Sequence, residues 1–259
     1  MTSSTFETTT PDHVSYLDRL AGTDAGRSYK RRMFEELDVR AGQKVLDVGC
    51  GPGTDLGSLA ETVTPAGAVI GVDSDEKMVD AARERTAGLP AVEVCLGDVH
   101  DLPLADGTVD RARTDRVLQH VADPARALTQ IRRVLRPGGR LAMGEPDWDT
   151  LAIDHPDSGL SSAYTRHVTD QVIRNARIGR QLARLAADAG FSVPVVIPVT
   201  PVFRDVQAAD RVLGLERTTR RAVAAGYLTA EDARRWLDHL ARGPFLAAVT
   251  FYIIVAEPA

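Results

Sequence analysis

At 259 residues, with 44% hydrophobic and 26% charged residues, the chain has an ordinary globular composition and can bury a full core. A net charge of −5 disfavours nucleic acid as a partner, and the absence of any run of about 18 apolar residues excludes a helical membrane span. Residues 1–10 are predicted to be a polar tail without the features of a signal peptide, and Cys50 and Cys95 are the only cysteines. We therefore expect a reduced, cytoplasmic protein.

The elements predicted in chain order begin with helical spacing over residues 12–38, broken at residues 22–26. Short apolar runs then alternate with helical patterns, with strands at 44–48, 68–73, 91–96, 108–114 and 139–146 and helices near 54–63, 75–87 and 123–136. Such alternation indicates a parallel sheet with right-handed crossovers. The remaining chain predicts a helix over 159–189 broken near 175–178, a strand at 193–202, helices near 205–225 and 230–242, and a last strand at 245–255.

The most informative segment is VLDVGCGPGTD, residues 45–55, in which a buried strand runs into a glycine-rich turn and a helix. Glycine has no Cβ and lets a ligand approach the backbone closely. Asp73 closes the next apolar run, at a distance from the turn that suits a bidentate contact with a ribose diol. Together these features predict an adenosine-containing ligand across the carboxyl ends of the first two strands.

Two kinds of adenosine ligand compete for this turn. A dinucleotide motif, G-x-G-x-x-G, would need glycine where Thr54 stands, and the third glycine comes one place early, at Gly53. Asp55, at the helix start, would also repel a diphosphate. The pattern D-x-G-x-G-x-G instead resembles motif I of class I S-adenosylmethionine-dependent methyltransferases.

The resemblance continues in family order over roughly residues 45–145. Residues 71–74 with Met78 resemble the family's acidic loop, 97–99 its adenine loop, 110–120 its motif IV, and 135–141 the turn before strand five. It implies an α/β, Rossmann-like fold with a seven-stranded, mostly parallel sheet, an antiparallel last strand, N-terminal lid helices and a helical insertion near the C-terminus. We divide the chain accordingly into a tail with lid helices, 1–38, and a methyltransferase domain, 39–259, with substrate-cap segments at about 147–176 and 205–242.

The resemblance also implies S-adenosyl-L-methionine as the cofactor and assigns residues to it. In it, Asp73 accepts from both ribose hydroxyls, Asp98 accepts from the adenine amino group, and the carbonyl of Thr114 holds the cofactor ammonium, which Asp47 helps to organise. The predicted cofactor set is Asp47, Gly49, Cys50, Gly51, Asp73, Ser74, Met78, Gly97, Asp98, Val99, Thr114 and Arg32.

The predicted fourth strand is unusually charged for a central parallel strand. Buried arginines must be paired, so we expect Arg111 and Arg113 to meet acids on adjacent elements. Arg116, after this strand, is a candidate to face the cofactor carboxylate, as are Arg31 and Arg32 of the lid helix, and Arg32 is placed in the cofactor set.

Methyl transfer requires in-line positioning and desolvation, and a general base only if the acceptor carries a proton at neutral pH. The candidate base is His120, just past strand four. The resemblance to small-molecule members implies a partner acid at the end of strand five, Glu145 or Asp147. The alternative for His120 is a structural role as a cap of the following helix.

Further polar residues of the expected cap are His155, Tyr164 and His167, which either line the substrate pocket or pack the cap. The six histidines lack metal-ligand spacing, so no metal is predicted.

The predicted function is methyl transfer to oxygen or carbon of a small apolar or aromatic acceptor, because the cap segments carry Trp148, Tyr164, Phe203 and Trp236. The Asn/Asp-Pro-Pro-Tyr motif of amino-methylating relatives is absent after strand four. The chain is most similar to the bacterial group of quinone-biosynthesis and natural-product methyltransferases, and its insertion suggests secondary metabolism. The predicted partner is a small molecule, without nucleic acid or membrane, and the apolar C-terminal strand leaves room for a homodimer.

Three alternatives remain open at this point. An enzyme of this fold can keep the cofactor site and catalyse cyclisation, decarboxylation or hydroxylation. A cofactor-binding regulator without turnover would carry the same motifs. A dehydrogenase would bind a nicotinamide dinucleotide instead.

Overall fold

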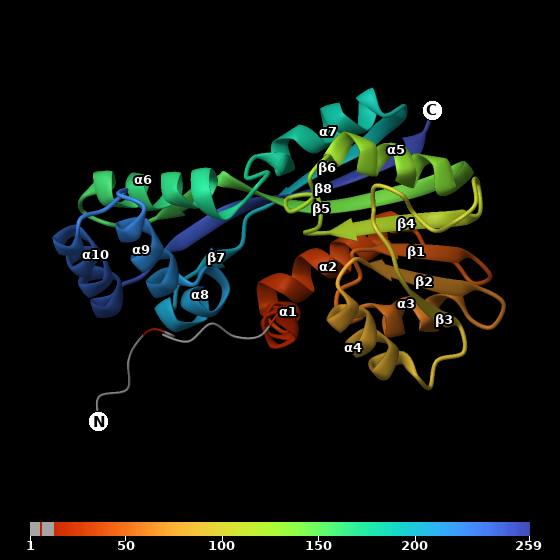
Figure 1. Ribbon diagram of the computed structural model, residues 1–259, viewed down its shortest axis with the longest axis horizontal. Coiled ribbons are helices and arrows are strands. Elements are labelled where there is room, and N and C mark those ends of the chain that lie inside the picture. Colours follow the sequence, from red (N-terminus) through yellow and green to blue (C-terminus); the bar gives the residue numbers. More distant parts are fainter. Residues whose placement is uncertain (1–5, 7–12) are drawn as a thin grey trace.

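The computed structural model describes residue 6 and residues 13–259, so the tail predicted for residues 1–10 lies outside the described residues except for Phe6. A central sheet runs the length of the molecule and carries helices on both faces (Figure 1). Its strand order is β3-β2-β1-β4-β5-β8-β6, and β7 pairs with β8. The strands are β1 Lys44–Val48, β2 Ala68–Asp73, β3 Val92–Leu96, β4 Val109–Asp115, β5 Leu135–Ile153, β6 Phe191–Val199, β7 Val202–Phe203 and β8 Ala247–Pro258.

The strand directions confirm the predicted fold class. Strands β1 to β5 are parallel, and β8 runs antiparallel to both β5 and β6. Within the part of the chain that the structure describes, the sheet has eight strands rather than the predicted seven. The additional strand is β7, two residues long, which separates from the predicted strand 193–202 after Val199.

Helices α5 and α7 cover one face of the sheet, and α2, α3 and α4 cover the other (Figure 1). The side chains of Asp75 and Asp123 cap α4 and α5 by accepting backbone N–H bonds, and Pro124 fits the first turn of α5. The helices are α1 His13–Ala21, α2 Asp24–Leu37, α3 Leu56–Val63, α4 Glu76–Thr86, α5 Pro124–Val134, α6 Ser158–His167, α7 Ile178–Asp188, α8 Val206–Leu213, α9 Leu215–Ala224 and α10 Ala230–Arg242, with a π-helical turn, η1, at Val168–Val172.

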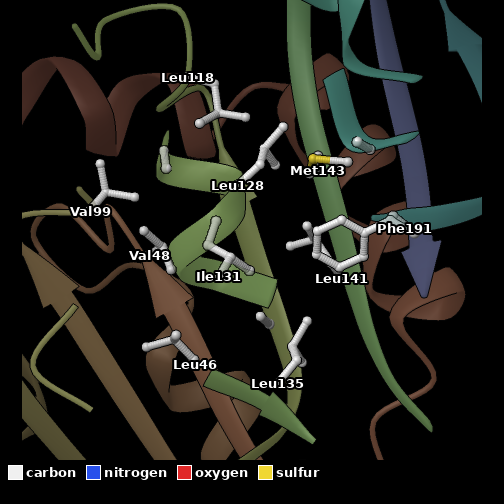
Figure 2. Packing of buried hydrophobic residues seen from close by; sticks show 14 of the residues in the cluster. Leu46, Val48, Val99, Leu118, Leu128, Ile131, Leu135, Leu141, Met143 and Phe191 are labelled. Carbon is white, nitrogen blue, oxygen red and sulfur yellow. The ribbon is translucent and has the colours of Figure 1, made fainter. Parts of the chain in front are cut away.

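The main core lies between the sheet and the α5–α7 layer. Leu46 of β1, Leu128 and Ile131 of α5, and Leu141 and Met143 of β5 are fully buried in one cluster (Figure 2). Each such aliphatic side chain contributes about 1.5–3 kcal/mol by burial. This packing holds the strands against α5 and α7 and leaves the carboxyl ends of the strands free to form a ligand site.

The largest departure from the predicted elements is the length of β5. It was expected to end at residue 146 but continues to Ile153, because β8 pairs with it from Leu141–Ala256 to Ile153–Ala247. Residues 147–153 are therefore strand. A single sequence does not reveal this extension, since it depends on a partner strand about 100 residues away.

The far ends of β5 and β8 carry a separate group of helices, α6, α8, α9 and α10 (Figure 1). They pack around the fully buried rings of Trp236 and Tyr164, whose centroids are 5.4 Å apart. The helix predicted at 205–225 is two helices, because Gly214 adopts a left-handed conformation with φ of +60° and ends α8. The expected break in the preceding helix is present between η1 and α7.

Candidate active site

A cleft of about 620 Å³ lies at the carboxyl ends of β1, β2 and β4. Its volume falls within the range of roughly 300–1,000 Å³ typical of small-molecule sites. Because carboxyl ends of parallel strands meet at one edge of a sheet, the loops that follow them converge here. The predicted cofactor residues that line the cleft are Gly49, Gly51, Asp73, Ser74, Met78, Gly97, Asp98 and Val99.

The glycine-rich turn after β1 is held against the end of β2. The backbone N–H groups of Gly49 and Cys50 donate to the carbonyl of Val72 at 2.7 and 3.1 Å. Gly49 has a φ of +68°, and a Cβ there would lie 2.3 Å from Cγ2 of Val117. Only glycine fits this position, so the backbone itself forms the cleft wall.

Asp73, at the end of β2, is oriented by two backbone groups. The N–H of Gly51 donates to Oδ2 at 2.8 Å, and the N–H of Asp75 donates to Oδ1 at 3.0 Å. Each carboxylate oxygen can accept a further hydrogen bond. The arrangement presents two fixed acceptor atoms to the cleft, as a vicinal diol requires.

Asp98, after β3, is held by a histidine that the sequence analysis did not single out. Oδ1 of Asp98 accepts from the backbone N–H of His100 at 2.9 Å and contacts its Nδ1 at 2.6 Å, and Nε2 of His100 accepts from the N–H of Asp123 at 3.1 Å. The bond from the His100 backbone is the main cause that lowers the pKa of Asp98. An ionised, oriented acceptor results. The Asp-x-His spacing, an Asx-turn pattern, is the signal that could have identified His100.

Beneath the glycine turn lies a buried group of charges around Arg113 of β4. The Arg113 guanidinium, 2% exposed, lies 3.5 Å from Asp47, 2.9 Å from Asp55 and 3.1 Å from Asp115. Lys30 of α2 contacts Asp55 at 2.5 Å and Asp115 at 3.4 Å. The expectation that Arg113 meets acids on adjacent elements is confirmed.

The other charged side chain of β4, Arg111, turns away from this group. It donates to the backbone carbonyls of Leu37 and Asp38 at 2.9 and 3.2 Å and lies 4.0 Å from the Asp38 carboxylate. The two arginines that make β4 look too polar for a central strand thus both have partners, carboxylates for Arg113 and backbone carbonyls for Arg111.

Two carboxyls of the Arg113 group ionise differently. Burial has the largest influence on Asp47 and raises its pKa to about 6 against the attraction of Arg113. Burial also opposes ionisation of Asp55, but Arg113 and Lys30 outweigh it and lower the pKa of Asp55 to about 2. Asp47 lies farther from the Arg113 guanidinium than Asp55 does. A cation bound nearby would therefore shift the ionisation of Asp47 more than that of Asp55.

Four members of the predicted cofactor set do not line the cleft. Asp47 and Cys50 line a small cavity of about 40 Å³ under the glycine turn, and Thr114 is fully buried in β4. The placement of Arg32 in the cofactor set is corrected, since Arg32 lies on the outer side of α2 and pairs with Glu36 at 2.7 Å. Helical periodicity explains this: Tyr29, Met33 and Leu37 of α2 pack inward, and Arg32 falls outside that stripe.

A second, smaller pocket of about 190 Å³ adjoins the cleft. Tyr16, Leu17, Arg116 and His120 line both cavities and form their common boundary. The other walls are mostly apolar and come from distant parts of the chain: Pro146, Trp148, Ile173, Pro201, Phe203, Val212, Val249 and Phe251. The sequence singled out Trp148 and Phe203, but not Tyr16, Leu17 or Phe251.

The two acids predicted to assist His120 belong to neither cavity. The pleat of β5 turns Pro146 and Trp148 toward the apolar pocket and Glu145 and Asp147 to the opposite face. Asp147 is engaged by Arg180 of α7. The prediction of a dyad at the pocket is therefore corrected, because side chains one residue apart on a strand face opposite ways.

Glu145 instead organises the turn after β4. Its Oε1 accepts from the N–H groups of Val117 and Leu118 at 2.8 and 2.6 Å. The carboxyl is fully buried, and burial raises its pKa to about 8 even though these bonds favour the charged form. Glu145 thus holds the backbone turn that positions His120, and it lines neither of the two cavities.

The other polar candidates of the cap pack within the distant helical group. The ring of His155 lies 5.3 Å from Trp236 and 4.5 Å from His239, Tyr164 stacks on Trp236, and His167 contacts Tyr227. None of the three lines the apolar pocket.

Across residue 6 and residues 13–259, no group of three or more His, Cys, Asp or Glu side chains is placed to hold a metal ion. No helix in the same part of the chain combines the length and the apolar character needed to cross a bilayer.

Comparison with known proteins gives consistent matches. Residues 40–189 match the family model described as a methyltransferase domain. The chain is 68% identical over 252 residues, 97% of its length and 73% of the relative's, to an uncharacterized 37.1 kDa protein in transposon TN4556 of Streptomyces fradiae. It is 33% identical over 137 residues to the demethylmenaquinone methyltransferase of Staphylococcus aureus (strain JH9), spanning 53% of this chain and 57% of that protein. The structure resembles that of a SAM-dependent methyltransferase from Aquifex aeolicus, with a TM-score of 0.55 and 26% identity over 73% of this chain and 92% of the other.

Proposed function

The chain belongs to the family of S-adenosylmethionine-dependent methyltransferases, and from this premise we propose that it methylates an oxygen or carbon atom of a small, apolar or aromatic acceptor. The observation that carries the proposal is the pair of adjoining cavities, a polar cleft of about 620 Å³ and an apolar pocket of about 190 Å³ with a common boundary. One suits the cofactor and the other the acceptor, and methyl transfer needs the two side by side.

The residues of the cleft fit S-adenosylmethionine. The two oriented oxygens of Asp73 match the ribose hydroxyls, and the ionised Asp98 matches the adenine amino group. The glycine turn offers backbone in place of side chains to the methionine part, above the carboxylates of the Arg113 group. Negative charge at this end suits a ligand that carries an ammonium and a sulfonium.

When bound there, S-adenosylmethionine would supply a methyl group activated by its sulfonium for transfer to the acceptor atom, with S-adenosylhomocysteine as the leaving group. The contribution of the chain is to position the acceptor and to exclude water. Tyr16 and Leu17 of α1 lie on the common boundary of the cavities and belong to the lid predicted for residues 1–38. The walls provided by Trp148, Phe203 and Phe251 favour an apolar or aromatic acceptor.

His120 is the proposed general base, because it is the one histidine among the described residues that lines both cavities. Its assistance matters for an acceptor that keeps its proton at neutral pH. Glu145 takes part indirectly, since it holds the backbone turn on which His120 stands.

Calorimetric titration with S-adenosylmethionine, S-adenosylhomocysteine and NAD tests the cofactor first. We expect micromolar binding of the first two and none of NAD, after which incubation with methyl-labelled cofactor and a panel of phenols, enols and quinols should label one acceptor class. Failure to bind either adenosyl compound would overturn the proposal.

The reaction itself has one class of competitor on this fold, a cyclisation, decarboxylation or hydroxylation in which the enzyme keeps the cofactor bound and does not consume its methyl group. Mass spectrometry of the products separates the two, because methylation releases one S-adenosylhomocysteine for each product and adds one methyl group. Product formation without S-adenosylhomocysteine would favour the competitor, and cofactor binding without turnover of any acceptor would favour a regulator.

A further inference from the structure

Arg116 occupies an unusual position at the boundary of the two cavities. It lines the cofactor cleft, the apolar pocket and the small cavity under the glycine turn. Its φ of +58° lies in the left-handed region, one of only two non-glycine residues with positive φ among those described. Such a conformation is held at a cost that the surrounding structure must offset, and it marks functional sites more often than ordinary turns.

The guanidinium of Arg116 lacks a close partner. Its one ionic contact is 3.8 Å from Nε to Oδ1 of Asp115, and Nε is buried without a hydrogen bond among the described residues. Arg113, three residues earlier, contacts three carboxylates. A guanidinium carries five donors and keeps its charge at any physiological pH. Arg116 therefore has binding capacity that the protein itself does not use.

The other polar groups of the apolar pocket are already engaged. The amide of Gln119 accepts from Nε1 of Trp148 at 2.8 Å, and the hydroxyl of Tyr16 donates to the carbonyl of Val212 at 3.1 Å. Tyr29 donates to Asp115 at 3.1 Å. Among the described residues, Arg116 is the single charged residue in the lining of this pocket. A neutral acceptor that filled the pocket would cover the guanidinium without compensating its charge, which is unfavourable.

We propose that the acceptor binds as an anion, with a carboxylate or an acidic phenol or enol oxygen paired to Arg116. This inference rests on the proposed function and specifies its substrate class. Where the paired oxygen is also the atom that is methylated, its proton has left before the pairing is complete, either to solvent or to His120, and Arg116 then reduces the demand for a base. The pocket of about 190 Å³ is smaller than typical ligand sites of roughly 300 Å³ or more, which favours a small ring with one acidic group.

The competing partner of Arg116 is the carboxylate of the cofactor, since the same side chain also lines the cleft. The two partners predict different losses on mutation. If the acceptor is the partner, removal of the guanidinium weakens binding of anions in the pocket and leaves cofactor affinity nearly intact. If the cofactor is the partner, the reverse holds.

The test uses shape-matched probes with saturating S-adenosylhomocysteine: benzoate against benzamide, and 4-nitrophenolate against 4-nitroaniline. In wild-type protein we expect calorimetry to show that the anion of at least one pair binds roughly 10- to 100-fold more tightly than its neutral partner, as for a charge-assisted bond. The first pair reports on carboxylates and the second on acidic phenols. This comparison needs no variant.

Variants then locate the effect. Arg116→Met should abolish the preference for the anion and change S-adenosylhomocysteine affinity by less than about threefold, while Arg116→Lys should retain part of the preference. Arg177→Met is the matched control, because it removes an exposed arginine that pairs with Asp149 and lines neither cavity; it should behave as wild type.

Three outcomes would overturn the inference: equal binding of anion and neutral partner, no binding of either anion at millimolar concentration, or loss of S-adenosylhomocysteine affinity in Arg116→Met with the anion preference intact. The last would assign Arg116 to the cofactor carboxylate. Failure of wild type to bind S-adenosylhomocysteine at all would instead overturn the proposed function.

Discussion

The two cavities of the site are built in opposite ways. The cofactor cleft is lined mainly by residues 48–121, from short loops that each follow a strand, whereas the apolar pocket collects residues from Tyr16 to Phe251. Local turns make the first cavity, and the long pairing of β5 with β8 makes the second. A change in one wall should therefore affect one ligand and spare the other, except at the residues of the common boundary.

The largest expected effect is at Asp73. Replacement by alanine removes two ribose acceptors, each worth about 1.5–3 kcal/mol as a charge-assisted bond, and should weaken S-adenosylmethionine binding by roughly 100-fold or more. Circular dichroism should show an intact fold, because Asp73 contributes two turn bonds and no core packing. Asp75→Ala is the control, since it removes the cap of α4 from the adjacent loop without touching the cleft lining. Unchanged affinity in Asp73→Ala would mean that the cofactor lies elsewhere.

His120 lies on the common boundary of the two cavities, so its replacement should affect the rate of methyl transfer more than the binding of either ligand. For an acceptor that carries a proton, His120→Ala should slow turnover at neutral pH by roughly 100-fold, the usual scale of general base catalysis, with little change in cofactor affinity. The deficit should shrink at alkaline pH, where the acceptor ionises unaided. Steady-state rates across pH provide the measurement, and His155→Ala, on a histidine in the distant helical group, provides the control. A rate–pH profile like that of wild type would leave His120 with a structural role.

The same contrast explains what could be predicted from the sequence. Gly49, Gly51, Asp73 and Asp98 lie within short motifs whose spacing is fixed by a strand and its turn, and the structure brings them together in the cleft. The parallel direction of the first five strands followed from the alternation of strands and helices, and the antiparallel last strand followed from the family resemblance.

The acceptor wall could not be predicted in the same way. The orientation of Glu145 and Asp147 depends on the register of β5 with β8, and a shift of one residue exchanges the faces of a strand. Phe251 reaches the pocket only through that pairing. Arg32 was assigned to the wrong face of its helix. The helical spacing of Tyr29, Met33 and Leu37, which pack inward, already indicates that Arg32 points outward.

Trp148 tests the acceptor wall alone. Trp148→Ala should raise the KM for the acceptor about tenfold, since the indole forms part of an apolar wall, and should leave the S-adenosylhomocysteine affinity unchanged. Trp148→Phe is the matched variant, because it keeps a smaller aromatic ring in the wall and removes the bond from Nε1 to Gln119. It should lie much nearer to wild type. If both variants lost cofactor affinity as well, the two cavities would not be independent.

The smallest expected effect concerns pH and the charges under the glycine turn. The pKa of Asp47 is raised to about 6, mainly by burial, so this carboxyl gains a proton as the pH falls below that value. The group around Arg113 then loses one negative charge, and the positively charged S-adenosylmethionine should bind several-fold more weakly at pH 5 than at pH 7.5. S-adenosylhomocysteine lacks the sulfonium charge and should show a smaller change. Calorimetry of both ligands across this range measures the difference.

The variant Asp47→Asn separates Asp47 from other groups that titrate nearby. His100 and His120 also line the cleft and remain in the variant, so any difference in pH dependence from wild type belongs to residue 47. The variant should bind S-adenosylmethionine with the weaker, low-pH affinity throughout and lose most of the dependence. An unchanged pH dependence in Asp47→Asn would show that the buried charges under the turn do not sense the cofactor, and that the cleft recognises it through the loops above them alone.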